Sequence, residues 1–303
     1  MTGMEHRQSD LEPVGLVGPG RMGLALAQRL KACGRKVIVY RRRNTSRTEQ
    51  WISAGGAIAD SISGLGDCPA VMLSLPTSDD VRSIAQSLLA VLRPGALILD
   101  ASTIHPSAAR ECAMLAQRYG VTWLDTPVSG GPAGAANGTL AIMAGGSPDG
   151  FERARPLLAD LGKTIANLGN SGAGLICKLA NNLLLAVSAL ATCETLSLAA
   201  KAGLRPQATL GMWRAGSGYN KFMDARAQAL AQFGAFEPAQ FTVSMLLKDL
   251  RVAMDACAEI GFTPDSLRPT LEAFERAEAM GLGEHDFSAV LRVVEARAGV
   301  AVA

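Results

Sequence analysis

The chain has 303 residues, a length typical of about two domains. Hydrophobic residues make up 49% of it and charged residues 18%, which predicts a globular protein with a sizeable core and argues against intrinsic disorder. The formal net charge of +2 provides no general attraction for polyanions, so we expect no nucleic-acid partner.

Cysteine and histidine usage argues against a disulfide framework or a metal site. The six cysteines contain no C-x-x-C pair, and the three histidines are widely spaced. This pattern predicts reduced thiols in a cytoplasmic protein that binds no metal. Residues 1–12 are polar and lack the apolar stretch of a signal peptide, so we expect them to be disordered.

A dinucleotide-binding pattern lies near the N-terminus. Residues 14–17 predict a short apolar strand, residues 22–33 predict a helix closed by Gly34, and residues 36–40 predict a second strand. Between the first strand and the helix, a G-x-G-x-x-G fingerprint is formed by Gly18-Pro19-Gly20-Arg21-Met22-Gly23. Placed in this way, the fingerprint predicts a turn that holds the diphosphate of a nicotinamide dinucleotide.

The residues after the second strand indicate which dinucleotide binds. A site for NAD places Asp or Glu there, against the ribose 2′-hydroxyl. This chain instead has Arg41, Arg42 and Arg43. Guanidinium groups suit a 2′-phosphate and offer no acceptor to a hydroxyl, so the sequence predicts NADP(H) rather than NAD.

Short apolar runs then alternate with helical patterns, which is typical of a doubly wound parallel sheet of the Rossmann type. The expected strands are residues 57–59, 70–75 and 96–100, and the expected helices are residues 44–53, 107–119 and one that begins after Thr77. We expect strands at 122–125 and 139–144 to extend the same sheet, and a helix at 150–161 and a strand at 163–167 to complete the domain.

From about residue 174 only helical patterns appear. The first helix runs from near Ala173 to about Ala200, on the order of 40 Å, and is expected to join the two domains. Its apolar stretch approaches the length of a membrane span, but polar residues interrupt it, which favours a helix buried inside a protein. We therefore predict a dinucleotide-binding domain over 13–172, an all-α domain over 173–303, no membrane partner, and an apolar helix surface that favours a homo-oligomer.

Polar and glycine-rich segments follow several predicted strands, where ligands collect in parallel sheets. One such segment contains Leu75 and Pro76, and another contains Thr103. A third, Ser129-Gly130-Gly131, presents consecutive backbone N–H groups that suit a carboxylate. A glycine-rich turn without a ligand explains that third segment equally well.

Lys178 and Asn182 lie four residues apart near the start of the long helix, and hence on one face of it. They are consistent with a lysine that reaches solvent from a helix end beside an asparagine bonded to the backbone. Alternatively, Lys178 is an acid/base whose pKa is lowered by burial and nearby cationic charge. The Lys248-Asp249-Leu250 step in a later helix decides nothing by itself.

Together these segments resemble the β-hydroxyacid dehydrogenase family, which includes 3-hydroxyisobutyrate dehydrogenase, tartronate semialdehyde reductase and glyoxylate/succinic semialdehyde reductases. The resemblance covers roughly residues 13–295 and rests on motifs in the family's order. Besides the fingerprint they are Asp100-Ala101-Ser102-Thr103-Ile104, Asp125-Thr126-Pro127-Val128-Ser129-Gly130-Gly131, Gly138-Thr139-Leu140, Gly172-Ala173-Gly174, Lys178-Leu179-Ala180-Asn181-Asn182 and Lys248-Asp249-Leu250.

The resemblance implies an oxidoreductase that interconverts a small β-hydroxy acid and its semialdehyde or keto acid with NADP(H). Lys178 would be the catalytic acid/base and Asn182 would orient the substrate. Ser129, Gly130 and Gly131 would hold the substrate carboxylate. Residues implied to bind the cofactor are Gly18, Pro19, Gly20, Arg21, Met22, Gly23, Arg41, Arg42, Leu75, Pro76, Thr103 and Lys248. The usual assembly is a homodimer or homotetramer.

The chain departs from the family pattern at Pro19, where Leu is usual, and at His105, where a small residue is commoner. The far end of the substrate is expected near Trp213 and residues 219–222. An imine reductase is a second reading, although such enzymes usually carry Asp or Tyr in place of Lys178. A non-catalytic nucleotide sensor is a third.

Overall fold

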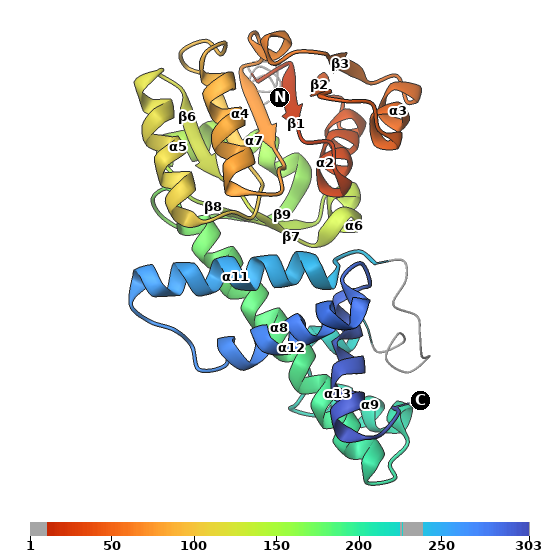
Figure 1. The fold of residues 1–303 in the computed structure, drawn as a ribbon. Helices are drawn as coiled ribbons and strands as arrows, with labels where there is room; N and C mark the ends of the chain where they lie inside the picture. The colour runs from red at the N-terminus through yellow and green to blue at the C-terminus, as the bar shows by residue number, and fades with distance from the viewer. Residues whose placement is uncertain (1–10, 225, 227–238, 303) are drawn as a thin grey trace. The chain divides into compact units, whose positions relative to one another are not determined.

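The computed structural model of the protein describes residues 11–224, 226 and 239–302. The chain divides into two compact units, the first ending at Lys178 and the second beginning at Leu179 (Figure 1). Helix α8 (Ala173–Lys201), 29 residues long, carries the chain from one unit into the other. Most of the predicted disordered segment, residues 1–10, lies outside the described residues, whereas Leu11 is buried in the core of the first unit.

The first unit is built on a six-stranded parallel sheet with the strand order β3-β2-β1-β4-β5-β6. The predicted doubly wound fold is therefore confirmed, with the order reversing between β1 and β4. The strands are β1 (Val14–Val17), β2 (Val37–Tyr40), β3 (Ala57–Ala59), β4 (Ala70–Leu73), β5 (Leu97–Asp100) and β6 (Thr122–Asp125).

Successive residues of the central strands enter two separate cores, one on each face of the sheet. In β4, Met72 packs in a core that includes residues of α2 and α7, whereas Val71 and Leu73 pack in a core that includes residues of α4 and α5. This explains why the strands read as continuous apolar runs. The helices of this unit up to α7 are α2 (Arg21–Ala32), α3 (Ser46–Ser53), the 3₁₀ turn η1 (Ile62–Leu65), α4 (Ser78–Leu89), α5 (Pro106–Arg118), α6 (Gly131–Asn137) and α7 (Pro148–Leu161).

The expectation that residues 139–144 extend the main sheet was wrong. They form β8 (Leu140–Ala144), which lies between β7 (Val128–Ser129) and β9 (Gly162–Asn167) in a separate three-stranded sheet. The strand expected at 163–167 is present as β9. An apolar pattern does not decide which strand a segment pairs with, because pairing depends on which backbones lie side by side. The last residue of β6, Asp125, forms an isolated bridge with Gly145, which directly follows β8. Beyond it, the Met143 N–H donates to the Pro127 carbonyl at 3.0 Å, so β8 pairs with the segment after β6.

The described part of the second unit is helical, apart from an isolated bridge between Thr242 and Asp286. Besides the rest of α8, it contains α9 (Pro206–Ala215), α11 (Val243–Ile260), α12 (Leu267–Ala277), η2 (Glu278–Leu282), η3 (Phe287–Ala289) and α13 (Val290–Ala298). Its core combines apolar residues of α8, α11, α12 and α13.

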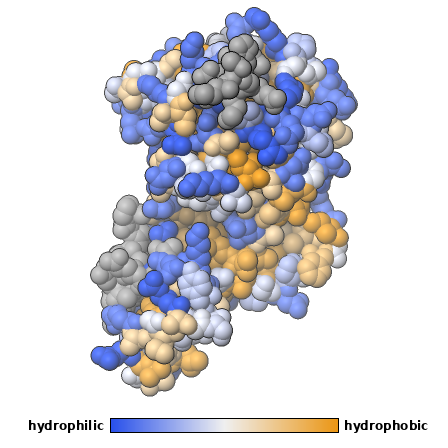
Figure 2. All heavy atoms as spheres, turned by 180° about the vertical axis from the view of Figure 1, so that it is seen from behind, coloured by the Kyte–Doolittle hydropathy of each residue, from blue (hydrophilic) through white to orange (hydrophobic). Residues whose placement is uncertain are grey.

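Helix α8 is apolar over most of its length. By length and composition it is the one helix among the described residues that could also cross a membrane, and 44% of its most apolar stretch is buried inside the structure. Ala186, Cys193 and Leu196 of α8 pack in the core of the second unit, whereas Leu184 and Leu198 are 67% and 69% exposed. Other apolar side chains also reach the surface, where they appear orange in Figure 2.

Candidate functional site

The three fingerprint glycines have different physical roles in the turn between β1 and α2. Gly18 has a φ of +85°, and a Cβ there would lie 2.2 Å from the Ser74 carbonyl oxygen. A Cβ on Gly23 would lie 2.1 Å from the Gly18 carbonyl oxygen, so this glycine lets the helix pack against the turn. A Cβ on Gly20 would meet nothing within 4 Å, so the space above Gly20 is open.

The N-terminus of α2 suits an anion. Gly20 is its N-cap without a side-chain hydrogen bond, and the first turn contains no acidic residue. Backbone N–H groups and the positive end of the helix dipole are thus available to the diphosphate of a dinucleotide. Of the other fingerprint residues, Arg21 is exposed, while Pro19 and Met22 are half-buried.

The arginines after β2 are not equivalent. Arg41 Nε donates to Asp60 Oδ1 at 2.8 Å, and Arg41 Nη1 donates to Asn44 Oδ1 at 2.9 Å. Arg42 is exposed, and it makes no hydrogen bond or ion pair with another described residue. Asp60, which directly follows β3, was not identified from the sequence. It could have been found from the fact that the carboxyl ends of adjacent parallel strands, here β2 and β3, lie together.

The loops after β4 and β5 are joined by a short chain of hydrogen bonds. The Leu75 N–H donates to Ser102 Oγ at 2.8 Å, and the Ser102 N–H donates to Asp100 Oδ1 at 3.0 Å. This fixes the segment that carries Leu75 and Pro76 against the segment that carries Thr103, which is half-buried. Three predicted cofactor-binding residues are therefore on neighbouring loops.

His105 caps the helix that follows Thr103. Its Nδ1 accepts a hydrogen bond from the Ser107 N–H at 3.3 Å, and its own N–H donates to Ser78 Oγ at 3.1 Å. A histidine at this position therefore has a local structural role, starting α5 beside the first residue of α4.

The Ser129-Gly130-Gly131 segment joins β7 to the short helix α6. Gly130 and Gly131 have φ values of +128° and +65°, which explains glycine at both positions. A Cβ on Gly131 would meet nothing within 4 Å, and α6 has no side-chain N-cap. The backbone N–H groups here remain candidates for holding a carboxylate.

Lys178 lies in the second turn of α8 and is half-buried. Asn182 follows one turn later and is 1% exposed. Because both belong to one continuous helix, their side chains leave it on the same face. Lys178 is also the last residue of the first unit, whereas Asn182 belongs to the second.

Asn182 does not simply bond to backbone, contrary to the first alternative considered from the sequence. Its Nδ2 donates to Asp249 Oδ2 at 2.6 Å, and Lys248 Nζ lies 2.8 Å from Asp249 Oδ1. Asp249 is 3% exposed and joins the predicted substrate-orienting amide to the predicted cofactor-binding ammonium. The sequence could have indicated a buried role for Asp249, because this acidic residue lies on the apolar face of α11 that carries Leu246, Leu250 and Ala253.

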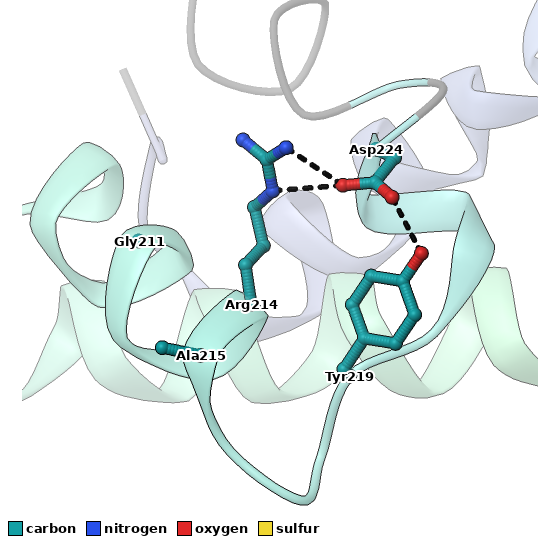
Figure 3. Close-up of a pocket in the computed structure, with 5 residues that line it drawn as sticks. All are labelled: Gly211, Arg214, Ala215, Tyr219 and Asp224. Atoms are coloured by element: carbon teal, nitrogen blue, oxygen red, sulfur yellow. Dashed lines mark hydrogen bonds and ion pairs between the residues drawn. The ribbon is translucent and has the colours of Figure 1, made fainter.

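Of the residues expected near the far end of the substrate, Phe222 is 2% exposed and belongs to the core of the second unit, with its ring centroid 5.6 Å from that of Phe287. Tyr219 is exposed and its hydroxyl donates to Asp224 Oδ2 at 2.5 Å, while Arg214 Nε donates to Asp224 Oδ1 at 2.9 Å. These three side chains line an open hollow of about 420 Å³ beside α9 (Figure 3). The Asp224 pairing raises the pKa of Tyr219 and lowers that of Asp224.

Among the residues that the structure describes, no group of three or more His, Cys, Asp or Glu side chains is arranged to hold a metal ion.

Comparison with known proteins identifies two families whose sequences match most of the chain. Residues 13–169 match the NAD binding domain of 6-phosphogluconate dehydrogenase, and residues 172–294 match the family described as NAD-binding of NADP-dependent 3-hydroxyisobutyrate dehydrogenase.

Individual relatives cover nearly the whole chain. A 2-(hydroxymethyl)glutarate dehydrogenase of Eubacterium barkeri is 33% identical over 95% of this chain and 97% of its own length. An NAD-dependent L-serine dehydrogenase of Pseudomonas aeruginosa is 32% identical over 95% of this chain and 100% of its own. The structure of Mycobacterium tuberculosis 3-hydroxyisobutyrate dehydrogenase with L-serine superposes with a TM-score of 0.83 at 32% identity, covering 93% and 98% of the two chains. The protein therefore belongs to the β-hydroxyacid dehydrogenase family of NAD(P)-dependent oxidoreductases.

Proposed function

We propose that the protein is an NADP(H)-dependent dehydrogenase that interconverts a small β-hydroxy acid and its semialdehyde or keto acid, with Lys178 as the acid/base. The observation that carries the proposal is the half-buried Lys178, one helical turn from the buried Asn182, in a chain whose glycine turn suits a dinucleotide. A non-catalytic nucleotide sensor would not need this pair.

The proposed chemistry divides between cofactor and protein. When bound, the nicotinamide accepts or supplies the hydride. In the oxidative direction Lys178 Nζ takes the proton from the substrate hydroxyl, and in the reductive direction it returns that proton to the developing alkoxide.

Asn182 is suited to orient the hydroxyl or carbonyl group of the substrate. Its Nδ2 is engaged with Asp249, which fixes the direction of the amide and leaves Oδ1 as an acceptor, already receiving a 3.1 Å bond from Asn181 Nδ2. The N–H groups of Ser129, Gly130 and Gly131 are the proposed carboxylate anchor. A substrate with a carboxylate near its reacting carbon would use both features.

The NADP(H) preference rests on the cluster after β2. The exposed Arg42 is the group best able to move onto a 2′-phosphate, and Arg41 beside it adds positive charge. We further propose that the protein is a homodimer or homotetramer, because α8 exposes Leu184 and Leu198 to solvent in a single chain. We propose a cytoplasmic location because the six cysteines contain no C-x-x-C pair.

The test measures oxidation of NADPH with glyoxylate, succinic semialdehyde and tartronate semialdehyde, and reduction of NADP⁺ with 3-hydroxyisobutyrate and L-serine. We expect turnover with at least one of these acids, and loss of at least about a thousandfold in kcat for Lys178→Ala, with NADPH affinity retained. Substantial activity in Lys178→Ala would remove the proposed mechanism. Activity with cyclic imines and none with carbonyl acids would favour an imine reductase instead.

A further inference from the structure

Two buried aspartates end neighbouring strands of the main sheet. Asp100 is the last residue of β5 and Asp125 the last residue of β6, and the two are register partners in the parallel ladder. Both are 0% exposed. Burying carboxyl groups side by side is costly unless each has partners or a proton, so this arrangement requires an explanation.

The partners of Asp125 belong to the segment that starts helix α8. Its Oδ1 accepts from the Gly172 N–H at 2.7 Å, and its Oδ2 accepts from the Leu175 N–H at 3.1 Å. The first N–H groups of a helix have no partner within the helix, and α8 has no acidic residue in its own first turn. A residue of β6 therefore supplies the negative end group that the helix itself lacks.

The contact is closely packed from several sides. A Cβ on Gly174 would lie 2.2 Å from the Met143 carbonyl oxygen, and a Cβ on Gly145 would lie 2.6 Å from Asp125 Oδ2. Asp125 and Gly145 also exchange backbone hydrogen bonds of 3.1 and 2.8 Å. This packing leaves the start of α8 little freedom to rotate or shift relative to β6.

The neighbouring Asp100 completes the arrangement. Burial raises its pKa to about 7, and its Oδ2 has no hydrogen-bond partner among the described residues. A protonated Asp100 relieves repulsion between the two carboxyl groups, while the N–H groups of the α8 segment oppose the pKa increase that burial imposes on Asp125. Of the two carboxyl groups, Asp125 is therefore the one that best carries the negative charge, because the Gly172 and Leu175 N–H groups donate to it.

Lys178 lies three residues after Leu175, in the next turn of the same helix. We propose that Asp125 is a positioning residue for the reaction: by fixing the Gly172 and Leu175 N–H groups, it sets the axial position and rotation of the α8 segment that carries Lys178. This inference rests on the proposed acid/base role of Lys178. Asp125 itself touches neither the substrate nor the cofactor in this proposal.

The experiment compares Asp125→Asn with Ser147→Ala. Ser147 caps α7 in the same unit, its Oγ accepting from the Gly150 N–H at 3.2 Å, so its loss also removes a helix cap but leaves α8 anchored. For each variant, kcat is expressed per NADPH-binding site, with sites counted by fluorescence titration. Any unfolded fraction is thereby removed from the comparison.

We expect kcat per site to fall about 10- to 100-fold in Asp125→Asn, because small misplacement of a reacting group has effects of this size. The Kd for NADPH should stay within about twofold of wild type, and Ser147→Ala should retain wild-type kcat per site. If Asp125→Asn does not fold, Asp125→Ser, which keeps one acceptor for an N–H group, replaces it with the same expectation.

Wild-type kcat per site in a folded Asp125 variant would overturn the inference, as would an equal loss in Ser147→Ala. Lys178→Ala distinguishes the two proposals. If Lys178→Ala is inactive and the Asp125 variants are active, only the positioning role fails, whereas an active Lys178→Ala removes the acid/base role on which it rests.

Discussion

The Arg41 guanidinium is held by the Asp60 carboxylate, with Nε and Oδ1 2.8 Å apart, at the ends of the adjacent strands β2 and β3. Three consecutive arginines are thus divided into one that is tethered and two, Arg42 and Arg43, that are exposed. The tethered arginine supplies fixed positive charge, and an exposed neighbour can close on a phosphate.

Arg42→Ala should therefore weaken the binding of NADPH more than the binding of NADH. Losing one charge-assisted contact with the 2′-phosphate is expected to raise the Kd for NADPH roughly 10- to 100-fold, with NADH changed less than about threefold. Isothermal titration with both cofactors measures the difference. Arg43→Ala is the matched control, and the Arg41/Arg42 double replacement should give the largest selectivity change. Equal losses for the two cofactors would contradict the assignment of this strand end to the ribose phosphate.

Gly20→Ala should separate cofactor binding from folding. The added Cβ meets no protein atom within 4 Å, and Gly20 has a φ of −73°, so thermal unfolding should stay near wild type. Its methyl group would occupy the space proposed for the diphosphate, and we expect dinucleotide affinity to fall at least about tenfold.

Gly23→Ala provides the contrast, because its Cβ would lie 2.1 Å from the Gly18 carbonyl oxygen. This variant should lose stability before any effect on binding can be measured. Unchanged dinucleotide affinity in a folded Gly20→Ala would show that the open space above the turn is not the diphosphate site.

Asp249→Asn should impair turnover by releasing two side chains at once. It removes the ion pair with Lys248 and the charged acceptor of the Asn182 amide. We expect kcat/KM for the acid substrate to fall roughly 10- to 100-fold, since charged hydrogen bonds in buried sites contribute about 1.5–3 kcal/mol. Asp255→Asn, on an exposed position of the same helix, is the control and should behave as wild type. Steady-state kinetics with saturating cofactor distinguish these outcomes.

Asp100 should make the stability of the protein depend on pH. Burial raises its folded pKa to about 7 from the usual 3.8, so the folded state holds the proton more tightly than the unfolded chain. The stability that this group contributes is fully present below the unfolded pKa and is lost as pH rises through the folded pKa. Between pH 5.5 and 7.5 the loss should be roughly 2 kcal/mol.

Asp100→Asn mimics the protonated form and cannot titrate. Urea unfolding at several pH values should show wild type losing stability relative to Asp100→Asn as pH rises across this window. Parallel stability curves for the two proteins would mean that Asp100 is ionised in the fold throughout.

The sequence by itself determined most strands and helices of the first unit, but not β7 or α6, and it determined the glycine turn and the helical character of the second unit. These depend on local chemistry: apolar runs that need burial, glycines where a Cβ or a negative φ is excluded, and capping residues such as Thr77, whose hydroxyl accepts from the Asp80 N–H. It also placed Lys178 and Asn182 on one helix face, because helical spacing alone fixes that relationship.

Only the tertiary structure decided which distant residues meet. An apolar strand pattern does not identify the strand that pairs with it. Residues 139–144 were therefore expected in the main sheet, whereas β8 pairs with β7 and β9 in a separate sheet. Likewise, the charged residues that organise the proposed site, Asp60, Asp125 and Asp249, act through partners 19, 47 and 67 positions away in the chain. Their roles arise from strand register and helix packing, which bring these groups into contact only once the core has formed.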